Sequence, residues 1–236
     1  MTVPLAERLQ VLAFDVFGTV VDWHGSIARE VNAMGLGVDG EAFASAWRAG
    51  YAPAMDRVRR GELGWTKIDD LHRLILDDVL ARFGVGHLDE QAKRHLNRVW
   101  HRLDPWPDTV AGLTRLKRRY TICTLSNGNL GLLANMAKRA GLPWDLILSA
   151  EVFRHYKPDP ETYLGVAQVF ELQPAQTMLV AAHKDDLQGA RRCGLVTAFV
   201  ERPLEFGRGV ARDLSREPAF DLHATDFNHL ADQLGC

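Results

Sequence analysis

The chain of 236 residues carries 28 Lys and Arg against 30 Asp and Glu, a formal net charge of −2 at pH 7. This balance, with 47% hydrophobic and 25% charged residues, is typical of a globular protein and does not favour a nucleic-acid-binding or membrane-surface protein. No apolar run approaches the roughly 18 residues of a membrane span, and the N-terminus does not resemble a secretory signal. The three cysteines lack metal-ligand spacing and make a poor disulfide framework, so we expect a reducing, cytoplasmic location.

The first predicted element is a buried strand over residues 11–17, in which apolar residues surround one carboxylate, Asp15. From about residue 25 to residue 102 the apolar residues recur at helical spacing, and no strand is predicted there. A Pro-rich joint at 103–110 ends this helical region. Beyond it, strands are predicted at 120–127, 146–150, 177–183 and 196–202, and helices at 108–119, 129–141, 160–170 and 184–194.

Strands that alternate with helices in this way predict an α/β fold with a Rossmann-like parallel sheet. We expect a core domain of residues 1–22 and 103–236, interrupted by an all-helical cap domain of residues 23–102. An insertion of roughly 80 residues is long enough to pack a small core of its own. The cap is expected to cover the carboxyl ends of the strands, where open parallel sheets place their chemistry.

Polar residues follow the predicted strands at these ends. Each has a common structural explanation, because a strand-end Asp often caps a turn and an Asp at a helix start often caps the helix. Together, in order along one edge of a sheet, they indicate a catalytic site. The set comprises Asp15, Thr19, Ser126, Asn127, Lys157, Tyr163, His183, Asp185 and Asp186.

The segments DVFGT, LSNG, YKPDP and VAAHKDD occur in the order of the haloacid dehalogenase superfamily, which the chain resembles over essentially its whole length. Within it, Trp47-Arg48, LSNGN and YKPDPETY make the chain most similar to the type II (S)-2-haloacid dehalogenases. The resemblance implies hydrolysis of short 2-haloalkanoic acids, such as haloacetates and (S)-2-halopropionate, to 2-hydroxy acids. It implies a small-molecule partner, no cofactor and no metal, and it is compatible with a homodimer.

The resemblance also implies roles for individual residues. Asp15 would attack the halogen-bearing carbon and form an ester that water then hydrolyses. Thr19 and Lys157 would position Asp15 and keep it ionised, and Asp186 would orient or activate the water, with His183 as a further candidate. The expected substrate-binding residues are Arg48 at the halide, Ser126, Asn127 and the backbone of Val16 and Phe17 at the carboxylate, Tyr163 behind them, and an apolar wall of Trp23, Trp47, Tyr51 and Phe17 around a small pocket.

Two positions separate this chain from the phosphatases of the superfamily. Those enzymes carry a second Asp, a general acid for the leaving alcohol, where this chain has Phe17; a halide leaves without a proton. Their Mg²⁺-binding acid falls at Ala182, which removes one oxygen ligand. Two alternatives stay open: a Mg²⁺-dependent phosphatase in which Asp185 substitutes as a ligand, and a non-enzymatic scaffold.

The chain also departs from the type II dehalogenases themselves. Ala182-His183 stands where they often carry Ser-Asn, so His183 could replace the asparagine beside the water or be a packed, neutral histidine. Phe17 stands in place of their usual tyrosine and removes a hydroxyl from the pocket. The preferred halogen, including fluorine, is left open.

Overall fold

The centre of the molecule is a six-stranded parallel sheet with strand order β5-β4-β1-β6-β7-β8, seen in a computed structural model that describes residues 4–236. The strands are β1 (Val11–Phe14), β4 (Thr121–Ser126), β5 (Leu146–Ser149), β6 (Thr177–Ala181), β7 (Val196–Val200) and β8 (Leu222–Ala224). The expected parallel α/β sheet is therefore confirmed. The five predicted strands are all present, but each ends one to three residues earlier than predicted, and β8 was not predicted.

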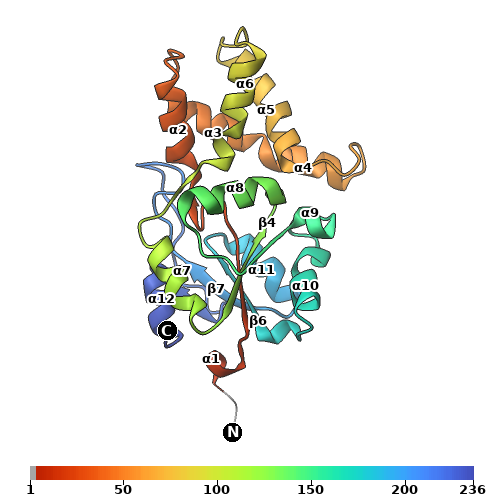
Figure 1. The fold of residues 1–236 in the computed structure, drawn as a ribbon, viewed down its shortest axis with the longest axis vertical. Coiled ribbons are helices and arrows are strands. Elements are labelled where there is room, and N and C mark those ends of the chain that lie inside the picture. The colour runs from red at the N-terminus through yellow and green to blue at the C-terminus, as the bar shows by residue number, and fades with distance from the viewer. Residues whose placement is uncertain (1–3) are drawn as a thin grey trace.

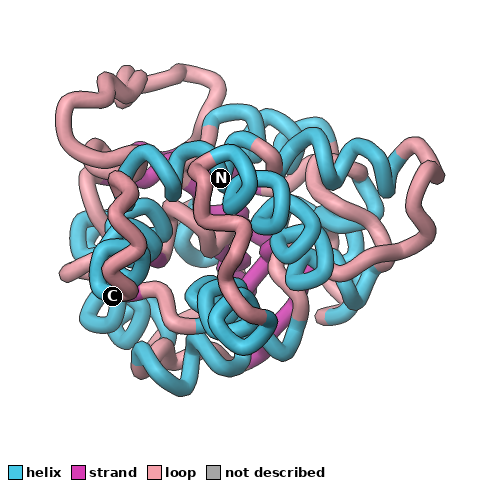
Figure 2. The backbone as a smooth tube through the Cα atoms, turned by 90° about the horizontal axis from the view of Figure 1, so that it is seen from above, coloured by secondary structure: helices cyan, strands magenta, loops and turns pink. Residues whose placement is uncertain are grey.

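Helices cover both faces of this sheet, as expected for parallel strands joined by crossovers (Figure 1). In the view turned by 90° from that of Figure 1, helices again enclose the strands (Figure 2). The helices of this part are α1 (Leu5–Arg8), α7 (Thr109–Lys117), α8 (Leu130–Ala140), α9 (Ala150–Phe153), α10 (Pro160–Val169), α11 (Lys184–Arg192) and α12 (Phe227–Gln233), with a 3₁₀ turn η2 (Pro174–Gln176). Within residues 4–236, none of the helices has the length and apolar character to cross a membrane.

A second group of helices lies above the sheet in Figure 1 and comes from the region between β1 and β4. It comprises α2 (Trp23–Ala33), α3 (Gly40–Ala49), α4 (Tyr51–Arg59), α5 (Ile68–Arg82), α6 (Glu90–Asn97) and the 3₁₀ helix η1 (Arg98–His101). Asp39 and Asp89 cap α3 and α6 by accepting backbone N–H bonds, a local signal that fixes where these helices begin. Residues 23–102 form no strand, in agreement with the helical periodicity.

The chain enters and leaves this helical group through a short antiparallel ribbon. Strand β2 (Val21–Asp22) pairs with β3 (Asp104–Pro105). Trp106 N and Thr109 Oγ1 add hydrogen bonds to the Val20 carbonyl at the base of the ribbon. We interpret the ribbon as the junction of core and cap; the division of the chain at residues 22 and 103 stays a prediction.

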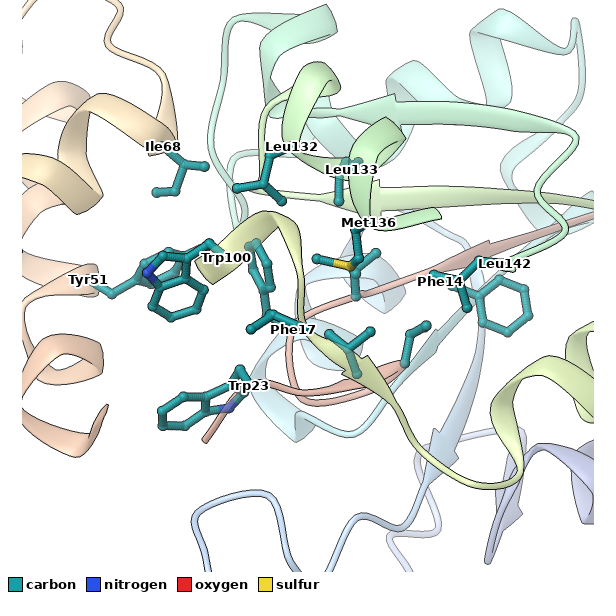
Figure 3. Packing of buried hydrophobic residues seen from close by; sticks show 14 of the residues in the cluster. Phe14, Phe17, Trp23, Tyr51, Ile68, Trp100, Leu132, Leu133, Met136 and Leu142 are labelled. Carbon is teal, nitrogen blue, oxygen red and sulfur yellow. The ribbon is translucent and has the colours of Figure 1, made fainter. Parts of the chain in front are cut away.

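Apolar packing is continuous from the core into the cap. Phe17, Trp23 and Trp100 lie between Tyr51 of the cap and Phe14 of the core (Figure 3). Trp23 and Trp100 have no exposed surface, and full burial of side chains of this kind contributes on the order of 1.5–3 kcal/mol each. This shared cluster packs the helices of residues 23–102 against the part of the chain that contains the sheet.

Candidate active site

The carboxylate of Asp15 stands just beyond the end of β1. Its backbone N–H still donates to Val180 O of the neighbouring strand β6 (3.0 Å), so the chain leaves the sheet directly after it. Three side chains contact the carboxylate: Thr19 Oγ1 donates to Oδ2 (2.7 Å), Lys157 Nζ donates to Oδ1 (2.9 Å), and His183 Nδ1 lies 3.1 Å from Oδ2. Thr19 is itself held, because its Oγ1 accepts from the Ala182 N–H (2.9 Å). The sequence prediction of a buried, closely held Asp15 at this edge agrees with this arrangement.

Lys157 connects Asp15 to Asp186. Its Nζ donates to Asp186 Oδ2 as well as to Asp15, and Tyr163 Oη donates to Asp186 Oδ1 (2.7 Å). Tyr163 reaches this position because residue 189 of α11 is a glycine; a Cβ there would stand 2.7 Å from the Tyr163 hydroxyl. Lys157, Tyr163 and Asp186 thus form one buried polar chain behind the nucleophile candidate.

The charges around Asp15 set its ionisation. Burial alone would raise the pKa of Asp15, but the Lys157 ammonium and His183 hold it far below its usual range. Burial alone would lower the pKa of Lys157, but Asp15 and Asp186 raise it above its ordinary value. Burial and the nearby Asp15 charge raise the pKa of Asp186, against the opposing effect of Lys157. At neutral pH the site therefore presents an ionised Asp15. This is the form in which a carboxylate oxygen can attack a carbon atom.

A cavity of about 440 Å³ lies between these residues and the cap. This volume lies toward the lower end of the range of roughly 300–1,000 Å³ for ligand pockets, and the expectation of a small pocket stays a prediction. Its walls include Asp15, Phe17, Arg48, Tyr51, Met55, Asn127, Lys157, Tyr163, His183 and Asp186.

Arg48, at the end of α3, brings a cation into this cavity from the cap side. Its guanidinium carbon lies 4.1 Å from the ring centroid of Tyr51 and 5.6 Å from that of Trp23. Its Nη1 atom is buried and has no hydrogen-bond acceptor among residues 4–236. A buried donor atom without an acceptor is costly, and an anion in the cavity would satisfy it.

The aromatic wall differs in part from the expectation. Phe17 and Tyr51 line the cavity, but Trp23 and Trp47 do not. Trp47 is fully buried, and its Nε1 donates to the His72 carbonyl (3.0 Å), so it packs inside the cap. His72 stacks on Trp100 at 4.0 Å, and burial lowers its pKa to about 3, so it is a neutral packing residue.

Asn127 also lines the cavity, and two backbone N–H groups near Asp15 have no hydrogen-bond partner in the described part of the chain. Asn127 Oδ1 accepts from Lys157 N (2.8 Å), which leaves Nδ2 pointing toward Met55 Sδ (3.3 Å) of the cap. The N–H groups of Val16 and Phe17 make no hydrogen bond with any of residues 4–236. Ser126 differs from the prediction in its placement: it is fully buried, accepts from Gly128 N (3.0 Å) and does not line the cavity.

One residue of the site has no counterpart in the sequence prediction. Glu205 is fully buried, and its Oε1 lies 2.8 Å from His183 Nε2. It comes from the segment 201–221, which joins β7 to β8 without a helix or strand. Its one sequence signal is an acid next to an aromatic in an irregular stretch, which is too weak to single it out.

The residues around Asp15 do not fit Mg²⁺. Such an ion would have to sit between Asp15 and an acid that follows β6, and the Lys157 ammonium occupies that position by bonding to both Asp15 and Asp186. Ala182 supplies no carboxylate oxygen. Within residues 4–236, no three His, Cys, Asp or Glu side chains are grouped as metal ligands. No step is therefore assigned to a metal.

The parallel sheet places a buried, ionised aspartate at the end of its first strand, beside a cavity below the helices of residues 23–102. The chain belongs to the family of haloacid dehalogenase-like hydrolases, whose model matches residues 9–194. It resembles a solved L-2-haloacid dehalogenase with 46% identity, a TM-score of 0.92 and coverage of 96% of this chain and 99% of the other.

Two further relatives have names of the same kind. A solved defluorinating L-2-haloacid dehalogenase is 45% identical, with a TM-score of 0.94 and coverage of 100% of this chain and 99% of the other. The (S)-2-haloacid dehalogenase 4A of Burkholderia cepacia is 28% identical over 208 residues, which are 84% of this chain and 85% of that protein. The resemblance on which the residue roles were expected is thus confirmed at the level of the family.

Proposed function

We propose that the protein hydrolyses the carbon–halogen bond of short 2-haloalkanoic acids, including haloacetates and (S)-2-halopropionate, to 2-hydroxy acids. The observation that carries this proposal is the pairing of an ionised Asp15 with Phe17 at the position of a proton donor. A carboxylate can displace a halide from carbon without a general acid, whereas an alcohol leaving group needs one. The names of the relatives support the same chemistry.

In the first half of the proposed reaction, an Asp15 oxygen bonds to the carbon and the halide leaves with the electron pair of its bond. The attack comes from the side opposite the halide, so the configuration at carbon inverts. Arg48 would face the departing halide, since it lines the cavity and its Nη1 is a buried donor without an acceptor. Asn127 Nδ2 and the N–H groups of Val16 and Phe17 would hold the substrate carboxylate. The Ser126 hydroxyl accepts from Gly128 N outside the cavity wall, so its side chain would have to rotate to reach the carboxylate.

In the second half, water adds to Cγ of the Asp15 ester and the hydroxy acid leaves. Thr19 and Lys157 would keep the carboxylate oriented, because each donates to a different oxygen. Tyr163 and Asp186 would position Lys157. The carbon is attacked once, so the inverted configuration is kept in the product.

The test is halide release from (S)-2-chloropropionate in the presence of a chelator. The proposal expects chloride from the wild-type protein and none from Asp15→Asn. The phosphatase alternative instead expects Mg²⁺-dependent phosphate release from an aryl phosphate, and loss of that activity in Asp185→Asn. Under the dehalogenase proposal, Asp185→Asn should leave most of the chloride release intact. Phosphate release with no chloride release would refute the proposal.

Two further properties accompany the proposal. A cytoplasmic location fits the three cysteines, which are all free. A homodimer fits the family and is tested by analytical ultracentrifugation of the purified protein.

A further inference from the structure

The buried carboxylate of Glu205 is unexplained by the half-reactions above. Its side chain has no exposed surface, yet it comes from a segment without regular secondary structure. Its Oε1 accepts from Trp23 Nε1 (3.2 Å) and lies 2.8 Å from His183 Nε2, and its Oε2 lies 2.9 Å from Arg212 Nη2. A buried carboxylate is costly unless it is paired, so these contacts hold it at a defined place.

The backbone of the DVFGT segment makes room for this carboxylate. Gly18 has φ +89°, and a Cβ at this position would stand 2.2 Å from Glu205 Oε1. A side chain at residue 18 would therefore exclude Glu205 from its place, apart from its backbone strain. Gly18, three positions after Asp15, and Glu205, 187 positions after Gly18, therefore fit one another.

His183 connects Glu205 to Asp15. Its Nε2 faces Glu205 and its Nδ1 faces Asp15 Oδ2 at 3.1 Å, so the imidazole lies between two carboxylates. The side chain is 18% exposed and lines the cavity, so water can reach it. With the Nε2 proton held by Glu205, neutral His183 has its free lone pair on Nδ1, beside the carboxyl group that water must attack.

Asp186, the other candidate base, is already engaged. Its Oδ1 accepts from Tyr163 and its Oδ2 accepts from Lys157. Because both oxygens already accept hydrogen bonds, a water at the Asp15 ester would have to displace Tyr163 or Lys157 to reach Asp186. His183 is the better placed base, although Asp186 was the first expectation for this role.

We propose that Glu205 is a positioning residue for hydrolysis of the Asp15 ester, and that it acts by holding His183 so that Nδ1 accepts the proton of the attacking water. This inference rests on the proposed function and deepens it. The type II dehalogenases often carry Ser-Asn where this chain has Ala182-His183. The inference assigns the role of that Asn side chain to His183, held in place by Glu205.

The proton steps balance. In the free enzyme, protonated His183 donates to Asp15 and to Glu205. Once Asp15 is esterified it no longer carries a charge, and His183 releases its Nδ1 proton to solvent. Water then adds to Cγ and its proton goes to Nδ1; the tetrahedral adduct expels the hydroxy acid, whose oxygen takes the remaining hydroxyl proton. The carboxylate and the protonated imidazole are both restored, and one proton and one halide are released per turnover.

The charged groups that face His183 give the expected pH behaviour. They are Asp15 on one side and Glu205 on the other, with Arg212 behind Glu205 and Lys157 behind Asp15. Burial alone would lower the pKa of His183, but Glu205 and Asp15 raise it to about 10. Removing the Glu205 charge should lower the pKa of His183 in the ester as well.

The experiment is a single-turnover reaction of Glu205→Gln with excess enzyme over (S)-2-chloropropionate, followed by rapid quenching and intact-protein mass measurement. We expect the halide burst to stay within about twofold of wild type. Ester decay should slow by on the order of 10²-fold, the usual contribution of a positioned base. The pH midpoint of ester decay should move downward, which a merely structural role would not cause.

The matched control is Glu201→Gln at the start of the same segment. Glu201 Oε1 lies 2.6 Å from His223 Nε2, in a second His–Glu pair that does not line the cavity. This variant should match wild type in both phases. Glu205→Asp keeps the negative charge but moves the carboxylate away from His183 Nε2, so ester decay should slow in this variant too. Glu205→Asp decides the question if Glu205→Gln does not fold.

Three results would overturn the inference. Ester decay at the wild-type rate and pH midpoint in Glu205→Gln would remove the role of Glu205. Equal slowing of burst and decay with an unchanged midpoint would reduce it to a structural role. Absence of any halide burst in the wild-type protein would refute the proposed function itself, and the inference with it.

Discussion

Replacing Lys157 with methionine should destabilise the protein strongly at neutral pH and weakly in acid. The methionine has a similar length but cannot donate, so Asp15 and Asp186 lose the ammonium that now bonds to both. Lys157 and Asp15 are 7% and 10% exposed in their side chains, so water cannot replace it. Removing one member of a buried ion pair costs about 3–5 kcal/mol, and a value in this range is expected at pH 7.

The sign of the pH dependence follows from the pKa directions. In the wild type the pKa of Asp15 is below its unfolded value, so its ionised form stabilises the fold above that value, and this stability is lost as the pH falls. Without Lys157 two facing carboxylates remain, and burial and mutual repulsion should raise the pKa of at least one of them. Protonation of that carboxyl, at a pH above the ordinary Asp value of about 4, then relieves the variant, so the difference between the proteins should already be smaller at pH 4 than at pH 7.

The assay is urea unfolding of both proteins at pH 7 and pH 4. Lys184→Met is the control, because Lys184 pairs at the surface with Asp213, whose side chain is 69% exposed; it should have a much smaller effect at both pH values. A Lys157→Met difference below about 1 kcal/mol at pH 7, the size typical of an exposed pair, would refute the reasoning. So would a difference that is equal at the two pH values.

Three further changes test separate parts of the site. Thr19→Val removes the donor to Asp15 and leaves Ala182 N without its acceptor. The value of kcat/KM for chloride release should therefore fall about 10-fold or more, which corresponds to the roughly 1.5–3 kcal/mol of a charged hydrogen bond. Thr19→Ser keeps the hydroxyl and should restore most of this loss. Arg48→Met should lower kcat for chloride release by on the order of 10²-fold with folding unchanged; equal kcat in the two proteins would contradict a halide contact. Gly18→Ala should lower the free energy of unfolding by about 1–3 kcal/mol from backbone strain alone, and further because the new Cβ clashes with Glu205. Urea unfolding should therefore show a smaller decrease in this free energy when Gly18→Ala is made in the Glu205→Ala protein.

The sheet could be predicted because its strands are fully buried runs between helical patterns. Their predicted ends were too late because apolar residues continue past the last sheet hydrogen bonds: Val16, Phe17 and Ala182 are buried but have left the strands. The prediction missed β8, whose three residues are too short for a pattern and whose first two are only half-buried. Periodicity locates a buried element, and the hydrogen bonds of its neighbours decide where it ends.

The candidate site was predictable to the extent that it depends on the ends of parallel strands. Asp15, Thr19 and His183 meet there because the sheet order brings β1 beside β6, and Lys157 reaches Asp15 from the loop that follows β5 and α9. Two features depend instead on packing between distant segments. Trp47 turns into the cap rather than the cavity, and Glu205 arrives from an irregular segment whose path no local pattern describes.

The most direct measurement of the central claim is a single turnover with excess enzyme in water enriched in heavy oxygen. If Asp15 bonds to the carbon, the 2-hydroxy acid carries ordinary oxygen from the carboxylate, and the heavy oxygen is found in the peptide that contains Asp15. Heavy oxygen in the product of that first turnover, with none in the peptide, would show that water attacks the carbon directly and would contradict the account.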